Sequence, residues 1–184
     1  MNSKTESTIR TALLARCKKG DNKAYKELYH LYAKAMLNIS IRIVNNLEKA
    51  EDVLQESFLK VFQNIEKFEQ EAAFAGWLKR VVINSSIDLV RKEKHNFISL
   101  DNTDYIEPNE EEEEEIVYDV GQVKKCIQLL PDGYRVVLTL YLFEDYSHRE
   151  IASTLNITEG TSKSQYNRAK KKLIELLKET KHGH

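Results

Sequence analysis

Apolar residues recur along the first half of this chain at the 3.6-residue spacing of amphipathic helices. Asp21 is suited to cap a helix, and the pair Asn45-Asn46 is suited to end one. Four helices able to bury one core follow from this pattern, which places a first domain over residues 7–96. The predicted helices cover about 7–19, 22–44, 47–65 and 74–92.

The second half repeats the helical spacing in shorter pieces. Ser147 and Glu150 have the spacing of a capping box, and Asn156 tolerates the left-handed conformation that ends a helix. A short helix, a three-residue turn and a longer helix then form a helix-turn-helix within a second domain, residues 116–180. The predicted helices cover about 116–129, 132–143, 147–155 and 159–178.

Between these domains the apolar content falls, over residues 97–115. Residues 101–119 contain ten acidic residues, among them the unbroken run Glu110 to Glu115, and no Lys or Arg. Such a segment buries too little apolar surface to offset the entropy lost on ordering, so the composition predicts a linker. The predicted fold is all-α, with two small helical domains joined by a flexible acidic linker, the second a four-helix domain containing a helix-turn-helix.

Composition agrees with a helical protein, since the 184 residues include only six Gly and two Pro. Cys17 and Cys126 lie far apart without a CxxC or His cluster, so we predict buried thiols, no disulfide framework and no metal site. No secretory signal or run of about 20 apolar residues appears, which predicts a cytoplasmic protein without membrane insertion. Nucleophile–base pairs and phosphate loops are also lacking, so no enzyme activity or cofactor is predicted.

The net charge of −1 conceals a strong segregation of charge. Residues 147–172 carry six basic and two acidic residues, and residues 76–95 carry five basic and two acidic residues. Lys and Arg that meet phosphates release counterions, which supplies much of the affinity for DNA. The last helix is also predicted to expose side chains that can hydrogen-bond to base edges, unless this is merely a solvated face. These are Thr161, Ser164, Gln165 and Asn167.

Four stretches, in this order, resemble the extracytoplasmic-function sigma factors of bacteria, over about residues 13–177. GDNKAYKELYHLY resembles their opening helix pair, and AEDVLQESFLKVFQNIEKF the segment that docks on RNA polymerase. FAGWLKRVVINSSIDLVRK resembles the helix that engages the −10 element. LPDGYRVVLTLYLFEDYSHREIASTLNITEGTSKSQYNRAKKKL resembles the domain that binds the −35 element.

The resemblance implies a protein that binds core RNA polymerase and promoter DNA, helps to open the duplex and leaves after initiation. Its partners would be the clamp helices of the largest polymerase subunit and, for the C-terminal domain, the flap region. Many members are held inactive by an anti-sigma factor, and the sequence leaves that partner open. The family threads its linker through basic polymerase channels, so the glutamate run would imitate phosphate charge there, or would only keep the linker extended.

The resemblance also implies roles for single residues, which occupy positions that match functional positions of the family. The docking helix would contact the clamp through Asp52, Gln55, Glu56 and Phe58, although Phe58 is equally compatible with the core. Trp77 could serve as a stacking platform for a base, but its helical phase with Val81 and Phe74 favours a place in the core. The residues that would contact the −10 element are Phe68, Lys79, Arg80, Asn84 and Arg91.

The −35 element would meet the helix-turn-helix. Many relatives have an aliphatic residue where this chain has Ser162, which either weakens packing or adds a polar contact. The alternative function is a conventional helix-turn-helix regulator that acts without core polymerase. The predicted −35 contacts are Arg149, Thr161, Lys163, Ser164, Asn167, Arg168 and Lys171.

Overall fold

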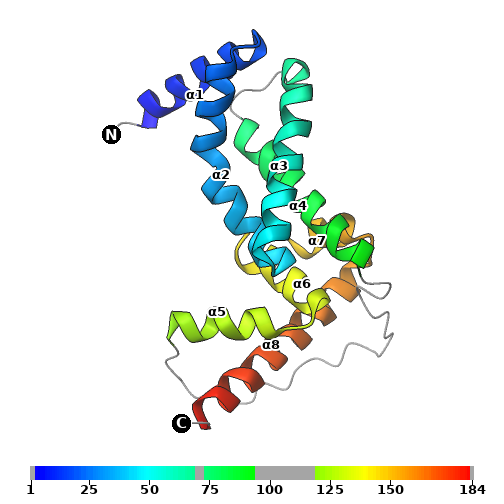
Figure 1. Ribbon diagram of the computed structural model, residues 1–184. Coiled ribbons are helices and arrows are strands. Elements are labelled where there is room, and N and C mark those ends of the chain that lie inside the picture. The colour runs from blue at the N-terminus through cyan, green and yellow to red at the C-terminus, as the bar shows by residue number, and fades with distance from the viewer. Residues whose placement is uncertain (1–2, 69–72, 94–118, 183–184) are drawn as a thin grey trace. The chain divides into compact units, whose positions relative to one another are not determined.

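The computed structural model describes residues 3–68, 73–93 and 119–182, and every regular element in these ranges is a helix, as predicted (Figure 1). The chain divides into two compact units, Met1–Leu89 and Val90–His184. The elements are α1 Ser3–Lys18, α2 Asn22–Val44, α3 Leu47–Asn64, the short 3₁₀ helix η1 Ile65–Lys67, α4 Phe74–Glu93, α5 Val120–Leu129, α6 Asp132–Leu142, α7 His148–Leu155 and α8 Glu159–His182.

The predicted domain limits remain a prediction, because the whole proposed linker, residues 97–115 with its run of glutamates, lies outside the described residues. The division between the units falls close to the end of α4, which continues to Glu93. Predicted helix ends agree to within a few residues. The largest differences, of about four residues, are at the start of α1, which begins at Ser3, at the start of α5, which begins at Val120, and at the end of α8, which extends to His182.

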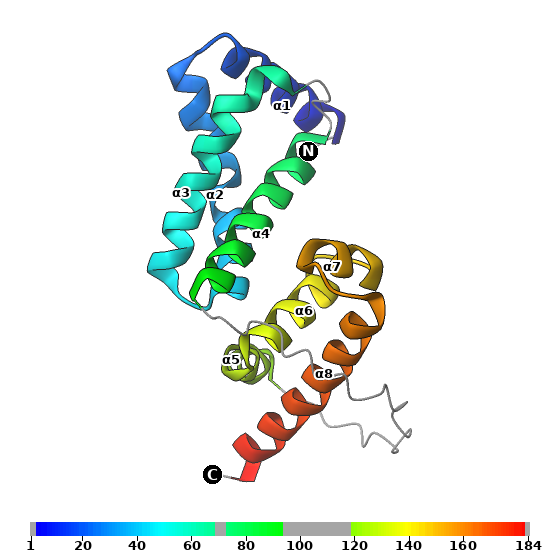
Figure 2. The ribbon, with the colours of Figure 1, turned by 90° about the vertical axis from the view of Figure 1, so that its right-hand side faces the viewer.

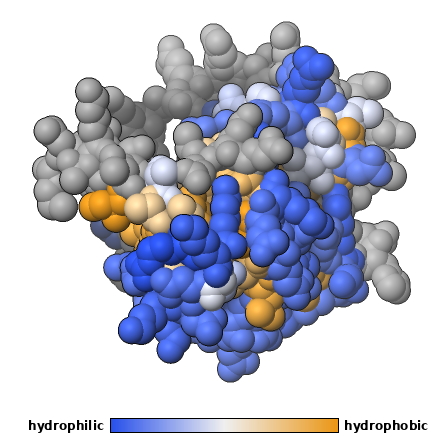
Figure 3. Space-filling model, turned by 90° about the horizontal axis from the view of Figure 1, so that it is seen from above, coloured by the Kyte–Doolittle hydropathy of each residue, from blue (hydrophilic) through white to orange (hydrophobic). Residues whose placement is uncertain are grey.

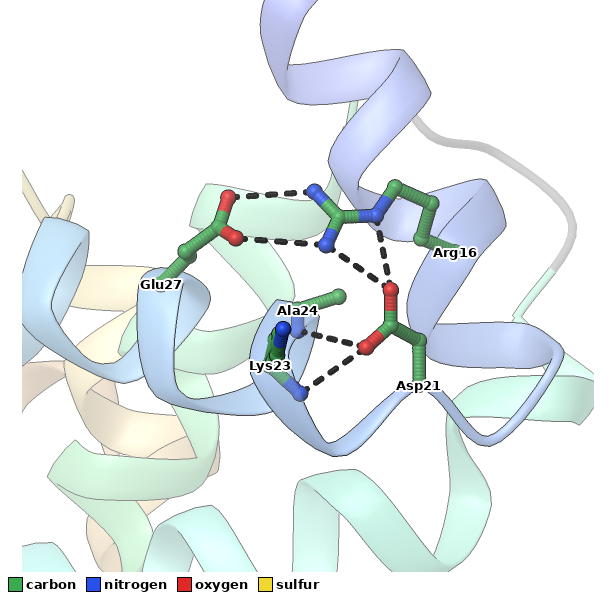
Figure 4. A network of polar contacts seen from close by, with 5 residues as sticks. All are labelled: Arg16, Asp21, Lys23, Ala24 and Glu27. Carbon is green, nitrogen blue, oxygen red and sulfur yellow. Dashed lines mark hydrogen bonds and ion pairs between the residues drawn. The ribbon is translucent and has the colours of Figure 1, made fainter.

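The turn between α1 and α2 is held by a network around Arg16 (Figure 4). Its guanidinium donates to Asp21 Oδ2 at 2.8 Å and, through both terminal nitrogens, to the Glu27 carboxylate at 3.2 Å. Asp21 also caps α2, as predicted, by accepting from the backbone N–H groups of Lys23 and Ala24. The hydrogen bond from Arg16 is the main cause that lowers the pKa of Asp21.

Helices α2 and α3 form an antiparallel pair joined by a two-residue turn (Figure 2). Asn45 takes the left-handed conformation, with φ of 58°, and Asn46 caps α3 by accepting from the Lys49 N–H at 3.0 Å. Aromatic rings then join the two helices. The ring centroids of Tyr29 and Phe58 lie 4.8 Å apart, and those of Tyr25 and Phe62 lie 4.7 Å apart.

The core of the first unit is built from the apolar stripes of all four helices. Its largest fully buried side chains are Leu14, Leu28, Ile43, Val61, Ile65, Phe74, Leu78, Ile83 and Ile87. Cys17 is also fully buried, and burial raises the pKa of its thiol to about 11. Seen from the top of the Figure 1 view, the surface is mostly hydrophilic and its hydrophobic areas are small (Figure 3).

In the second unit α8 packs against α5, α6 and α7. Asp119 caps α5 by accepting from the Gly121 N–H at 2.9 Å. Arg135 of α6 is buried, forms an ion pair with Asp132, and donates to the Leu130 carbonyl at 2.9 Å, which holds the turn between α5 and α6. One cluster of the core comprises Ile127, Leu130, Leu138 and Ala169, with Val123, Tyr134, Tyr166, Leu173 and Leu176 packed against it. Cys126 is buried and free, as predicted.

Candidate docking face and nucleic-acid interfaces

The predicted docking face lies on α3. Asp52, Gln55 and Glu56 are exposed and, at spacings of three and four residues, share one side of this helix. Glu56 forms an ion pair with Lys60 at 2.9 Å. Both side chains are half exposed or more, so water screens the pair and a competing partner can replace it at little cost.

Two findings revise the apolar part of this face. Phe58 is 2% exposed and packs between Tyr29 and Phe62, so its assignment to the docking surface is wrong and it belongs to the core. Leu59, which the sequence reading overlooked, is 61% exposed one turn beyond Gln55 and Glu56. Its spacing from the polar residues would have revealed it, because Leu59 follows Gln55 by four positions.

The predicted −10 contacts lie on α4 and just before it. Phe68 follows η1 and stacks on Trp77, with ring centroids 4.8 Å apart and an interplanar angle of 16°. Both rings are half-buried, so Trp77 is less enclosed than its helical phase predicted. The two rings form an aromatic platform, braced by the edge of Phe74 at 5.7 Å from Phe68.

Three of the four predicted polar residues of α4 line one side of the helix. Arg80 and Asn84 are exposed and Arg91 is half-buried, at spacings of four and seven residues. Lys79 is half-buried and, one position before Arg80, lies on a different side of the helix. The structure therefore brings together a mixed amide and guanidinium surface without Lys79.

The helix-turn-helix forms as predicted. Ser147 and Glu150 complete the capping box of α7, and Asn156 ends that helix with φ of 53°. Thr158 caps α8 by accepting from the Thr161 N–H at 3.0 Å, while the two threonine hydroxyls lie 2.8 Å apart. The start of α8 is therefore held by its own first-turn residues.

The predicted −35 residues gather on one side of α8. Ser164, Asn167, Arg168 and Lys171 follow the three- and four-residue spacing of a helix face; the first three are half-buried and Lys171 is exposed. Exposed Lys163 adjoins this face and pairs with Glu159 at 2.8 Å, a contact that lowers the Glu159 pKa. Arg149 is exposed on α7.

Two polar residues of α8 point away from that side. Gln165 is 3% exposed, so the prediction that it faces solvent is wrong. Ser162 is fully buried, and its Oγ lies 3.0 Å from Nδ1 of His148, which settles the alternatives at this position: the serine adds a polar contact. Sequence spacing alone could not identify the partner, because His148 lies on another helix.

Among the residues that the structure describes, no group of three or more His, Cys, Asp or Glu side chains is arranged to hold a metal ion. No helix in the same ranges has the length and apolar character needed to span a membrane.

Known proteins are similar to this chain in both sequence and fold. Residues 28–96 match the family Sigma-70 region 2, and residues 121–173 match the family Sigma-70, region 4. The extracytoplasmic-function (ECF) RNA polymerase sigma factor SigM of Bacillus subtilis is 30% identical over 82% of this chain and 93% of its own length. SigW of the same organism is 29% identical over 88% of this chain and 93% of its own length.

Among solved structures, the sigma factor RpoE of Bartonella quintana, in complex with the anti-sigma factor NepR, matches with a TM-score of 0.55 and 25% identity. That match covers 85% of this chain and 98% of the solved chain. The chain therefore belongs to the ECF sigma factors, which direct transcription initiation.

Proposed function

We propose that this protein is an alternative sigma factor that docks on core RNA polymerase through α3 and reads the two promoter elements through α4 and α8. The observation that carries the proposal is the succession of regions 2 and 4 along one chain. A conventional helix-turn-helix regulator needs only the second of these. The protein would act in the cytoplasm and catalyse no covalent step itself.

Docking is assigned to the exposed side of α3. Asp52 and Glu56 would pair with basic side chains of the polymerase clamp helices, while Gln55 offers an amide that fixes the register of the contact. Leu59, at 61% exposure, supplies apolar area at the same surface. In the same scheme, the C-terminal unit would meet the flap region of the polymerase.

Opening of the −10 element is assigned to α4 and the aromatic platform before it. A base that leaves the duplex loses a few kcal/mol of stacking, which a shaped and partly apolar surface must recover. The Phe68–Trp77 platform is half-buried and offers such a surface, and Asn84 offers an amide donor and acceptor. Arg80 and Arg91 would hold the adjacent phosphates.

Recognition of the −35 element is assigned to α8. Lys163, Ser164, Asn167 and Arg168 would reach base edges in the major groove, where Arg pairs well with guanine and Asn with adenine. Thr161 and Arg149 would contact phosphates at the ends of the two helices. Lys171 extends the same positive surface by one turn, which favours a second phosphate contact.

Run-off transcription tests the function as a whole. Purified protein is added to core RNA polymerase with a library of promoters randomised at both elements. We expect association with the core enzyme and transcripts that depend on both elements. A protein that fails to associate with the core enzyme but binds duplex DNA firmly by itself would instead be a conventional regulator.

Inhibition by a partner is a separate proposal. The Bartonella relative was solved with its anti-sigma factor, and CnrH was solved with the cytosolic domain of CnrY. We propose that an anti-sigma protein likewise sequesters this chain. In the test, proteins retained by the immobilised chain are purified and added to the run-off assay. Inhibition that excess sigma factor relieves supports the proposal, and retained proteins without this effect contradict it.

A further inference from the structure

A hydrogen bond inside the helix-turn-helix joins its two helices directly. Nδ1 of His148, at the first position of α7, lies 3.0 Å from Oγ of Ser162, in the first turn of α8. Ser162 is fully buried and His148 is half-buried. A buried hydroxyl that lost this partner would carry a desolvation penalty, so the two helices are held at the spacing that this contact requires.

The imidazole is also fixed by aromatic rings from two other places in the unit. It stacks on Tyr141 of α6, with centroids 4.6 Å apart and an interplanar angle of 19°. Tyr166 of α8 meets the imidazole edge-on at 5.6 Å and the Tyr141 ring at 4.5 Å. These contacts restrict rotation of the imidazole and keep Nδ1 directed toward Ser162.

The position of Ser162 links this contact to DNA reading. Its neighbours in the chain are Thr161 and Lys163, and Ser164 follows one residue later, all assigned to the −35 surface. Because a helix turn moves as a rigid body, a small rotation of α8 about the Ser162 contact displaces all three side chains. Such a displacement lengthens or misaligns the hydrogen bonds by which Lys163 and Ser164 would reach base edges, and hydrogen bonds weaken steeply with poor geometry.

We propose that His148 is a positioning residue for −35 recognition, which acts through its hydrogen bond to Ser162 and touches no base itself. This inference rests on the proposed function and deepens it. The pair adds a directional bond between the two helices, whose apolar residues Ile151, Leu155 and Ala169 are also buried. It therefore sets the angle at which the base-reading side of α8 is presented.

Position 162 offers a matched pair of variants. Val and Thr have nearly the same size and the same branching at Cβ, but only Thr keeps the hydroxyl. S162T and S162V therefore impose the same crowding and differ in the hydrogen bond. H148F provides the complementary change, because it keeps a ring between Tyr141 and Tyr166 and removes the nitrogen.

The experiment measures promoter discrimination with the full chain and core RNA polymerase. A promoter selected from the randomised library is compared with versions changed at one −35 base. Discrimination is the amount of transcript from the selected promoter divided by the amount from the changed promoter. We expect S162V and H148F to reduce this ratio by about three- to tenfold, as for loss of one net hydrogen bond. S162T should stay within about twofold of the original, and the H148F/S162V protein should be no worse than the poorer single variant.

A second measurement follows hydrogen exchange of the amides of residues 161–164 without DNA or polymerase. Exchange should be faster in S162V than in S162T. Equal discrimination by S162V and S162T, or fully additive losses in the double variant, would overturn the inference while leaving the proposed function intact. An original protein that gives no promoter-dependent transcript would overturn the proposed function, and the inference with it.

Discussion

The hydroxyl groups of Ser40 in α2 and Ser86 in α4 are hydrogen-bonded at 3.0 Å in the interior of the first unit. Both residues are fully buried, and Ser86 also donates to the Val82 carbonyl at 2.7 Å. Each hydroxyl is thus satisfied by a partner inside the protein. Since α4 carries proposed −10 contacts, this bond helps to set that helix against the rest of its unit.

Loss of one of the two hydroxyls should destabilise the first unit. We expect S86A to lower the free energy of unfolding by about 1–3 kcal/mol, because the Ser40 hydroxyl remains buried without its partner. The S40A/S86A protein should lose less than the two single losses combined. Denaturation by urea measures these values. S85A, at the adjacent half-buried position, should change stability by less than about 0.5 kcal/mol, and additive losses would contradict the coupling.

Charge reversal on the docking side of α3 should weaken polymerase binding without unfolding the protein. We expect E56K and D52K each to reduce affinity for core enzyme by about tenfold or more, because a cation there repels the basic partner and fails to replace the lost pair. Pull-down with core enzyme measures the effect, and circular dichroism reports the helices. E179K makes the same change at an exposed site near the end of α8 and should bind normally. Normal binding by both α3 variants would refute the docking assignment.

Truncation of Arg168 should relax the choice of base at one position of the −35 element. We expect R168A to lose about 1–3 kcal/mol of discrimination there, while transcription from unrelated positions changes little. Run-off assays on single-base variants of the promoter provide the measurement. K124A, which removes an exposed charge from α5, serves as the control for net charge. If R168A and the original protein show the same base preference at every −35 position, Arg168 does not contact a base there.

The capping box at the start of α7 should contribute to the stability of the second unit. Ser147 Oγ accepts from the Glu150 N–H at 3.3 Å, and Glu150 accepts from the Ser147 N–H at 2.9 Å. S147A should cost about 1 kcal/mol, which lowers the melting temperature of a unit of this size by about 4–8 °C. S147D retains a capping oxygen and should melt closer to the original protein. Equal melting of S147A and the original would show that the cap adds nothing.

Titration of His148 should make the second unit less stable in mild acid. Burial is the main cause that lowers the His148 pKa from its usual value near 6.5, the positive charge of Lys163 lowers it further, and Glu159 acts in the opposite direction. The unfolded chain then binds the proton at a higher pH than the folded chain. The contribution of neutral His148 to the free energy of unfolding is therefore complete above about pH 6.5. It is lost as the pH falls through the pKa of His148 in the folded state.

Urea unfolding between about pH 5 and 8 measures this effect. The slope of stability against pH in the acid part of the range should shrink in H148F. An unchanged slope in H148F would show that His148 titrates alike in both states.

Helix boundaries and turns were predictable because their causes lie within a few residues of chain. Asp21, Asn46 and Ser147 cap helices whose first N–H groups are two or three residues away, and Asn45 and Asn156 take the left-handed conformation at helix ends. These choices need no information about distant segments. The apolar spacing likewise identified the buried side of each long helix, and four stretches in order identified the family.

Whether a side chain near the edge of an apolar stripe is buried or exposed was decided only by the residues that pack over it. Sequence spacing left the position of Phe58 open and assigned Gln165 to the surface, and the structure buries both. The polar pairs Ser40–Ser86 and His148–Ser162 join residues 46 and 14 positions apart. The chain alone therefore determined its helices, caps and charge pattern, since these depend on local interactions. Tertiary packing decided which polar groups became internal partners, since a buried hydrogen bond needs two helices brought together at bonding distance.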